Sequence, residues 1–364
     1  MEAGEQPSRI TYGNYLRLDE MLNLQEGPVD YSPLPCNNEK HFIIVHQVFE
    51  LWFKLVLTEL KEVHKMMSSE HIDERSMPII VHHLKRVSAV FNLMSQQWKV
   101  METLTPQDFL SFRDRLGTSS GFESWQLRQI EIILGLEQQQ RDAGMDPLEH
   151  MEKLANEGKI SSVVLAEFNS VIESPSLYEL LKKWLCRTPV NGSFLGDDDD
   201  DAVISSYVNS HLAAMNSHSE MVISHFESIG HGDESTLRGR LDKSLANAEE
   251  FLRPSGVVDR SRVGLLFIES YRELPLLSWP RVMIDSFVEM EESILLFRNS
   301  HARMVERMIG KRMGTGGSSG VDYLDATLKY RIFVDLWTVR TILVRRDLLP
   351  DVANPEYYGF SSQV

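Results

Sequence analysis

Apolar residues recur at helical spacing along most of this chain, and that pattern limits its fold more than any other feature. The pattern is clearest in residues 39–68, where an apolar side chain returns every three or four positions. These side chains belong to Phe42, Val45, Phe49, Trp52, Val56, Leu60 and Val63. Such a stripe predicts a long helix with one buried face. Residues 200–229 and 280–311 predict two more long helices. No stretch shows the alternation of apolar and polar residues, bounded by hairpin turns, that is typical of strands. We therefore predict an all-α fold.

Three short motifs mark further helix starts, because a capping side chain precedes a proline that suits the first helical position. They are Thr105-Pro106, Asp146-Pro147 and Ser174-Pro175. Residues 25–38, 188–201 and 314–320 are predicted loops, and none of them resembles a long linker between domains. We therefore expect one helical domain over residues 1–364.

Two of these loops have unusual compositions. Residues 188–201 end in the acidic run Asp197–Asp201, which we interpret as a solvated connection. Residues 314–320 read GTGGSSG, and no Gly-Lys-Ser/Thr follows, so they are not a phosphate loop. Glycines allow the backbone to approach a ligand closely and a loop to close over it. Thr315 would add a hydroxyl group there.

Charge and cysteine content exclude several classes of partner and site. The 364 residues carry a formal net charge of −16 without a basic stripe, which argues against nucleic acid and anionic membranes as partners. Neither Cys36 nor Cys186 belongs to a Cys-x-x-Cys pair, which excludes a cysteine-rich zinc site and fits a cytoplasmic location. Residues 1–10 do not resemble a secretory signal, and no apolar run reaches the length of a membrane span.

Two histidines interrupt apolar helix faces. His46 lies one turn after Phe42, and His301 shares its face with Phe297 and Met304. For either histidine alone, a core imidazole bonded to a neighbour is the commoner explanation. In the functional alternative, Phe42 and His46 would form the wall of a pocket for a flat ligand. His301 would then offer the neutral imidazole that a haem iron takes as its axial ligand.

Arg128 lies in an amphipathic segment, and its planar guanidinium suits either a surface position or two-point pairing with a carboxylate. His211, His218 and His225 recur every seven residues. That spacing puts them roughly 10 Å apart along a helix, so one metal ion cannot join them. We interpret these histidines as a coincidental stripe on a solvated or partly buried face.

Several segments together resemble the tryptophan 2,3-dioxygenase family. The resemblance runs through residues 10–25, 41–60, 112–135 and 301–328, and continues into YRIFVDLW. Its most specific motifs are SSGFESWQLR, HARMVERMIG and GTGGSSG. The resemblance implies a helical enzyme with one haem b per chain, which inserts both atoms of O2 across the indole C2–C3 bond of L-tryptophan. The product would be N-formyl-L-kynurenine.

The same resemblance assigns roles to individual residues. His301 matches the proximal ligand of the haem iron, and His46 matches the distal histidine that bonds the indole N–H. Phe42 matches the aromatic residue that lines the indole pocket. Arg128 matches the residue that pairs with the substrate carboxylate, and Thr315 matches a threonine that helps to hold the amino-acid end.

The resemblance also implies a homotetramer. Residues 1–38 would form an arm that reaches a neighbouring subunit, where Tyr12, Tyr15 and Leu16 would close the pocket. Glu123 and Leu127 depart from the usual pattern beside the pocket motifs. Two alternatives therefore stay open. The first is a related haem enzyme that takes a modified tryptophan or inserts a single oxygen, and the second is a non-catalytic tryptophan-binding protein.

Overall fold

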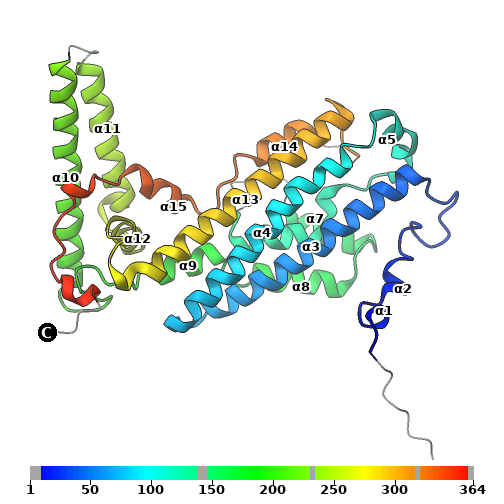
Figure 1. The fold of residues 1–364 in the computed structure, drawn as a ribbon, viewed down its shortest axis with the longest axis horizontal. Coiled ribbons are helices and arrows are strands. Elements are labelled where there is room, and N and C mark those ends of the chain that lie inside the picture. The colour runs from blue at the N-terminus through cyan, green and yellow to red at the C-terminus, as the bar shows by residue number, and fades with distance from the viewer. Residues whose placement is uncertain (1–9, 138–140, 142–145, 230–233, 316–319, 360–364) are drawn as a thin grey trace, which may run out of the picture.

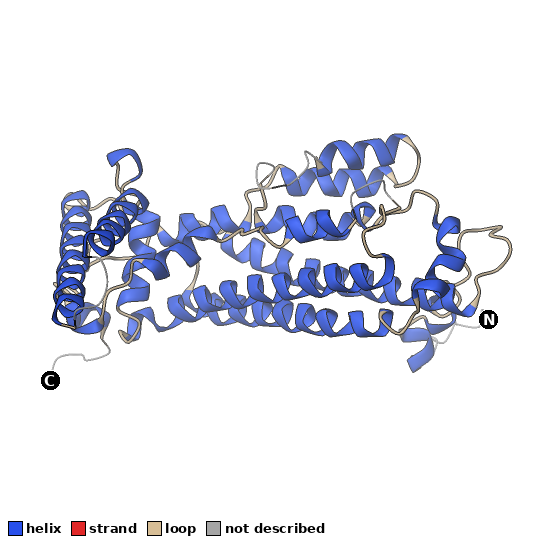
Figure 2. Cartoon of the chain, turned by 90° about the horizontal axis from the view of Figure 1, so that it is seen from above, coloured by secondary structure: helices blue, strands red, loops and turns tan. Residues whose placement is uncertain are grey.

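The chain is helical, as Figures 1 and 2 show. The computed structural model describes residues 10–137, 141, 146–229, 234–315 and 320–359. Within these ranges the only strand-like pairing is a single bridge between Val190 and Ser193. The all-α prediction is therefore confirmed. In the part that is described, no helix is both long enough and apolar enough to span a membrane.

Three long helices, α3 (Asn37–Met67), α4 (Met77–Met101) and α13 (Ser278–Ile309), pack side by side and form the body of the molecule (Figure 1). At one end, α10 (Asp200–Ser228) and α11 (Glu234–Leu252) pair as a hairpin. The other helices are α1 (Tyr12–Tyr15), α2 (Leu18–Met21), α5 (Pro106–Arg113), α6 (Trp125–Leu134), α7 (Pro147–Asn156), α8 (Ser162–Ile172), α9 (Leu177–Leu185), α12 (Arg260–Ser270), α14 (Val321–Thr327) and α15 (Val334–Thr338).

The apolar stripe that predicted α3 is the face that packs against the core. Val56, Leu60 and Val63 are fully buried there, against α4 residues such as Leu84 and Phe91. Burying a side chain of this size contributes roughly 1.5–3 kcal/mol relative to leaving it in water. The predictions for residues 39–68, 200–229 and 280–311 agree with α3, α10 and α13 to within two residues at each end.

Two of the three predicted helix starts are confirmed. The Thr105 hydroxyl accepts a hydrogen bond from the backbone N–H of Asp108 at 3.2 Å, and Asp146 caps α7 in a similar way. The prediction for Ser174-Pro175 is wrong, because α9 begins after Ser176. Ser176 and Glu179 cap each other reciprocally, which satisfies more N–H groups of the first turn than Ser174 could.

The interpretation of Asp197–Asp201 as a solvated connection is wrong for Asp200. This residue opens α10 and is only 5% exposed. Its carboxylate pairs with the Arg260 guanidinium at 2.7 Å and accepts a hydrogen bond from the Ser193 hydroxyl at 2.9 Å. A buried carboxylate requires such partners, so Asp200 joins the start of α10 to the start of α12.

Residues 1–9 and 316–319, which include most of GTGGSSG, lie outside the described residues.

The histidine stripe of α10 also differs from its interpretation, because His211 is fully buried. Its Nε2–H donates a hydrogen bond to the carbonyl oxygen of Ile342 at 2.8 Å. His225 is exposed and His218 is half-buried. Among the described residues, no group of His, Cys, Asp or Glu side chains is arranged to hold a metal ion. Burial lowers the pKa of His211 below its ordinary value, so the folded state keeps this imidazole neutral.

We expect His211 to make the folded chain less stable as the pH falls below about 6.5. The unfolded chain binds a proton there that the folded chain does not, so stability is complete above that pH and declines below it. One such group contributes a slope of at most about 1.4 kcal/mol per pH unit. Urea unfolding at pH 7 and pH 5 measures the slope, which should be smaller in His211→Gln. Equal slopes in the two proteins would contradict this role.

Candidate functional site

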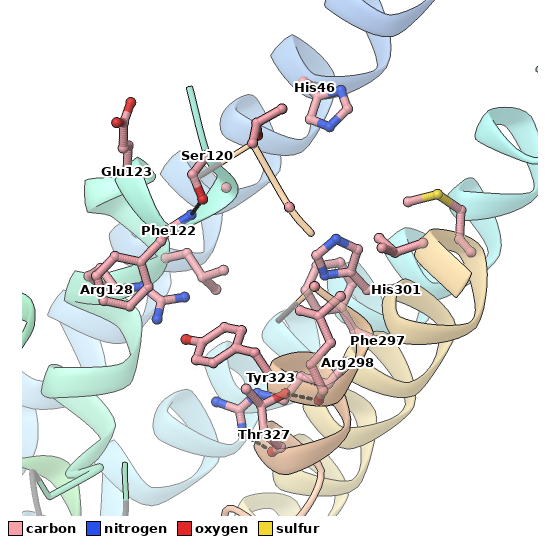
Figure 3. Close-up of a pocket in the computed structure, with 18 of the residues that line it drawn as sticks. His46, Ser120, Phe122, Glu123, Arg128, Phe297, Arg298, His301, Tyr323 and Thr327 are labelled. Carbon is pink, nitrogen blue, oxygen red and sulfur yellow. Dashed lines mark hydrogen bonds between the residues drawn. The ribbon is translucent and has the colours of Figure 1, made fainter. Parts of the chain in front are cut away.

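A cavity of about 710 Å³ lies between α3, α6, α13 and the segment that follows α13 (Figure 3). Five of the predicted site residues line it, although they come from four separate parts of the sequence. They are Phe42, His46, Arg128, His301 and Thr315. Tyr12, Tyr15 and Leu16 do not line this cavity in the described part of the same chain.

The hydrogen bond of His46 fixes the proton on its ring. Its Nδ1 lies 2.8 Å from the carbonyl oxygen of Phe42. A carbonyl oxygen can only accept, so Nδ1 carries the proton. Burial lowers the pKa of His46, which keeps the ring neutral and leaves Nε2 as a hydrogen-bond acceptor. The Phe42 ring lies 4.0 Å from the imidazole, between ring centroids, so both rings form one wall of the cavity.

His301 is held by stacking rather than by hydrogen bonding. Its ring lies parallel to the indole of Trp98, with 4.5 Å between centroids and 8° between planes. Burial, with smaller effects from His46 and Arg128, lowers the pKa of His301 to about 3. The imidazole is therefore neutral near pH 7 and retains a lone pair. None of the other described residues forms a hydrogen bond with its ring.

Trp98 was not among the predicted site residues, yet it links His301 to the core. Its indole packs on His301 on one side and lies 4.1 Å from the Phe49 ring centroid on the other. We expect Trp98→Ala to lower the free energy of unfolding by about 3–5 kcal/mol, because the cavity left in this packed site cannot collapse fully. Urea denaturation of the two proteins measures this loss. An unchanged midpoint would contradict the packing described.

Arg128 lies at the other end of the cavity and is only 6% exposed. Its guanidinium carbon lies 5.0 Å from the centroid of the Phe122 ring. Its Nη1 pairs with a carboxylate oxygen of Glu131 at 3.1 Å. Its Nε is buried and has no hydrogen-bond partner among the described residues. A buried donor without a partner is costly, so Nε is available to donate a hydrogen bond to a ligand.

Glu131 is a second residue that the sequence analysis missed. It is 4% exposed and pairs with Arg128, with Arg141 at 2.8 Å and with Arg298 at 3.1 Å. Burial acts to raise the pKa of its carboxyl group, but the three guanidinium charges outweigh burial and lower it. Only its position one turn after Arg128 could have pointed to it. Tyr323, also missed, places its ring beside Arg128 (Figure 3).

Thr315 is held at the edge of the cavity by the loop that precedes α6. Its hydroxyl donates a hydrogen bond to the carbonyl oxygen of Ser119. The guanidinium of Arg113 donates to the carbonyl oxygen of Met313 in the same segment. These contacts attach the segment after α13 to the α5–α6 connection. The hydroxyl of Thr315 therefore lies at the cavity with its proton engaged, and its oxygen can still accept a hydrogen bond.

The cavity suits a flat, largely apolar ligand with an acidic group. Aromatic and aliphatic side chains supply most of the wall, including those of Phe42, Ile294, Phe297, Met304 and Met308. The polar side chains of the wall include the neutral imidazoles of His46 and His301 and the buried guanidinium of Arg128. A single histidine is too few ligands for a bare transition-metal ion but suits an iron that is already held by a macrocycle. The residues present therefore fit a haem whose iron His301 would bind.

The family model and the similar proteins all point to one family. Residues 2–343 match the family model described as tryptophan 2,3-dioxygenase. Tryptophan 2,3-dioxygenase 2 of Ralstonia nicotianae is 38% identical, over 97% of this chain and 98% of its own. Tryptophan 2,3-dioxygenase of Sorangium cellulosum is 40% identical, over 97% of this chain and 89% of its own.

A shorter relative matches as well. A tryptophan 2,3-dioxygenase-like protein of Xanthomonas campestris pv. campestris is 40% identical over 71% of this chain and 98% of its own. The family model covers nearly the whole chain, and the first two relatives match almost end to end. The chain therefore belongs to the tryptophan 2,3-dioxygenase family.

Proposed function

We propose that this chain is a haem-dependent dioxygenase that converts L-tryptophan and O2 to N-formyl-L-kynurenine. The observation that carries the proposal is the convergence of His46, Arg128 and His301 on one cavity. A neutral imidazole suits a haem iron, a second one suits an indole N–H, and a buried cation suits a carboxylate. Membership of the family supports the reaction and the substrate.

His301 would hold the cofactor, haem b, by donating its neutral lone pair to the iron. When bound, the haem supplies the iron at which O2 is activated. A histidine that binds iron must stay unprotonated, and the low pKa of His301, about 3, keeps it so at neutral pH. The parallel Trp98 ring restricts rotation of the imidazole. Both properties suit His301 to hold the haem iron.

Arg128 and His46 would orient the substrate. Nε of Arg128, which has no partner among the described residues, and the adjacent Nη2 would pair with the α-carboxylate in two parallel hydrogen bonds. The unprotonated Nε2 of His46 accepts a hydrogen bond from the indole N–H. Contacts at both ends of the molecule fix the C2–C3 bond relative to the cofactor, which lowers the entropic barrier to reaction. Phe42 packs against the indole, and Thr315 contributes to binding the amino-acid end.

The N-terminal arm, residues 1–38, would complete the site of a neighbouring subunit in a homotetramer. Tyr12 and Tyr15 are 77% and 74% exposed, and Leu16 is exposed beside them. In α1 and α2 no residue is buried within this chain. Large apolar side chains gathered on one exposed segment are typical of a surface that a partner covers. The single domain and the cytoplasmic location inferred from the sequence stay predictions of the same proposal.

Haem titration of the purified protein, followed by turnover, tests this function. We expect a Soret band that saturates at one haem per chain, and N-formyl-L-kynurenine formation from L-tryptophan only in the reduced, haem-loaded protein. Haem binding without turnover of L-tryptophan would reject the proposed reaction. The comparisons do not favour the two alternatives, a modified-tryptophan enzyme and a non-catalytic binding protein.

A further inference from the structure

We propose that Glu131 is a positioning residue that holds the Arg128 guanidinium in the orientation required to bind the substrate carboxylate. It would do so by joining the helix that carries Arg128 to the helix that carries His301. The inference rests on the proposed function, in which Arg128 binds the carboxylate.

The contacts of Glu131 connect both ends of the cavity. Arg128 and Glu131 lie one turn apart on α6, with 3.1 Å between Nη1 and Oε2. The other oxygen, Oε1, lies 3.1 Å from Nη2 of Arg298 on α13. Arg298 lies one turn before His301 on the same helix. A single buried carboxylate therefore fixes the distance between the group that binds the substrate and the imidazole at the cofactor side.

The same contacts determine which edge of Arg128 faces a ligand. Glu131 forms an ion pair with Nη1, and the ring of Phe122 lies against one face of the guanidinium. On the remaining side of the group, Nε has no hydrogen-bond partner among the described residues, and Tyr323 lies beside the same guanidinium. Two-point pairing with a carboxylate needs an edge of this kind. Glu131 thus engages Nη1 and leaves Nε available to a carboxylate.

Removing the charge of Glu131 has two opposing effects. Arg128, Arg141 and Arg298 surround this one carboxylate, so its loss raises the positive potential, which attracts an anion. Its loss also leaves three buried guanidinium groups to repel one another, which moves Arg128 away from its present position. We expect the second effect to dominate, because two parallel hydrogen bonds form only when the guanidinium matches the carboxylate in position and orientation.

Binding of two ligands to the haem-loaded protein tests the inference. L-Tryptophan carries the carboxylate and tryptamine lacks it, so the ratio of their dissociation constants reports on the clamp alone. We expect Glu131→Gln to raise the Kd of L-tryptophan by about 30-fold and that of tryptamine by less than about threefold, as measured by calorimetry. Glu269→Gln is the matched control. Glu269 is also buried and lies 3.5 Å from an arginine one turn away, but it does not line the cavity.

Each outcome separates this inference from the proposed function. Equal weakening of both ligands in Glu131→Gln, or an unchanged ratio, would overturn the inference. If Arg128→Ala also kept the wild-type ratio of dissociation constants, Arg128 would not bind the carboxylate, and the proposed function of Arg128 would itself be rejected. If Glu131→Gln does not fold, Glu131→Asp tests the same point, since a shorter carboxylate cannot reach Arg128 and Arg298 together. A wild-type ratio in Glu131→Asp would then overturn the inference.

Discussion

His301→Ala should abolish stable haem binding and, with it, all turnover of L-tryptophan. His301 is the histidine in the cavity that is neutral to about pH 3 and stacked in place by Trp98. Without its lone pair the haem iron would have no bond from the protein, and only contacts with the cavity wall would hold the haem. We expect the haem content after gel filtration to fall from about one per chain to less than about a tenth. The absorbance of the Soret band measures it.

Two controls accompany the His301→Ala variant. His46→Ala should retain its haem, because His46 faces the same cavity from α3 and is assigned to the substrate. Added imidazole should restore haem binding to His301→Ala, since the free ligand can fill the space left by the side chain. A normal haem content in His301→Ala without imidazole would refute the assignment of the axial ligand. Unfolding midpoints close to wild type in both variants would show that the fold is intact.

Arg128→Ala should weaken binding of L-tryptophan by about 100-fold while leaving the haem spectrum unchanged. The change removes a buried cation that offers two parallel N–H donors. Truncating one partner of such a buried charge pair typically costs about 2–5 kcal/mol, and a 100-fold loss corresponds to about 2.8 kcal/mol. Calorimetric titration of the haem-loaded variant measures the loss. Because Arg128 acts before and during the reaction, we expect kcat/KM to fall at least as much.

Tryptamine gives the internal control for the Arg128→Ala variant. It lacks the carboxylate, so its binding should change by less than about threefold. Arg272→Ala is the control at another site, because Arg272 also pairs with a glutamate three residues away in sequence, Glu269, but does not line the cavity. Comparable losses for L-tryptophan and tryptamine would mean that Arg128 supports the cavity wall and does not recognise the carboxylate.

The helices could be predicted from the sequence because helical periodicity and capping are local properties. The stripe from Phe42 to Val63 repeats within single turns, so α3 is visible without knowledge of its neighbours. Local rules failed where two choices competed. Ser174 and Ser176 both resemble caps, and only the reciprocal bond with Glu179 decides between them. Asp200 resembled a solvated residue because its partner, Arg260, is distant in sequence.

The site was predictable only to the extent that the resemblance named its residues. Periodicity left His46 and His301 as core histidines, because nothing in either helix shows that both face one cavity. Trp98 reads as one more apolar residue of α4, and its stacking on His301 depends on how α4 and α13 are packed. Glu131 reads as a surface residue of an amphipathic helix. Its burial among three arginines arises from α6 and α13 meeting in space.

The most direct test of the proposed function is the mass of the product formed under isotopically labelled O2. The haem-loaded, reduced protein would be mixed with L-tryptophan, and the product analysed by mass spectrometry. We expect N-formyl-L-kynurenine that carries two labelled oxygen atoms, because both atoms of one O2 molecule would enter across the C2–C3 bond. A product with a single labelled oxygen, or none at all from protein with its haem in place, would contradict it.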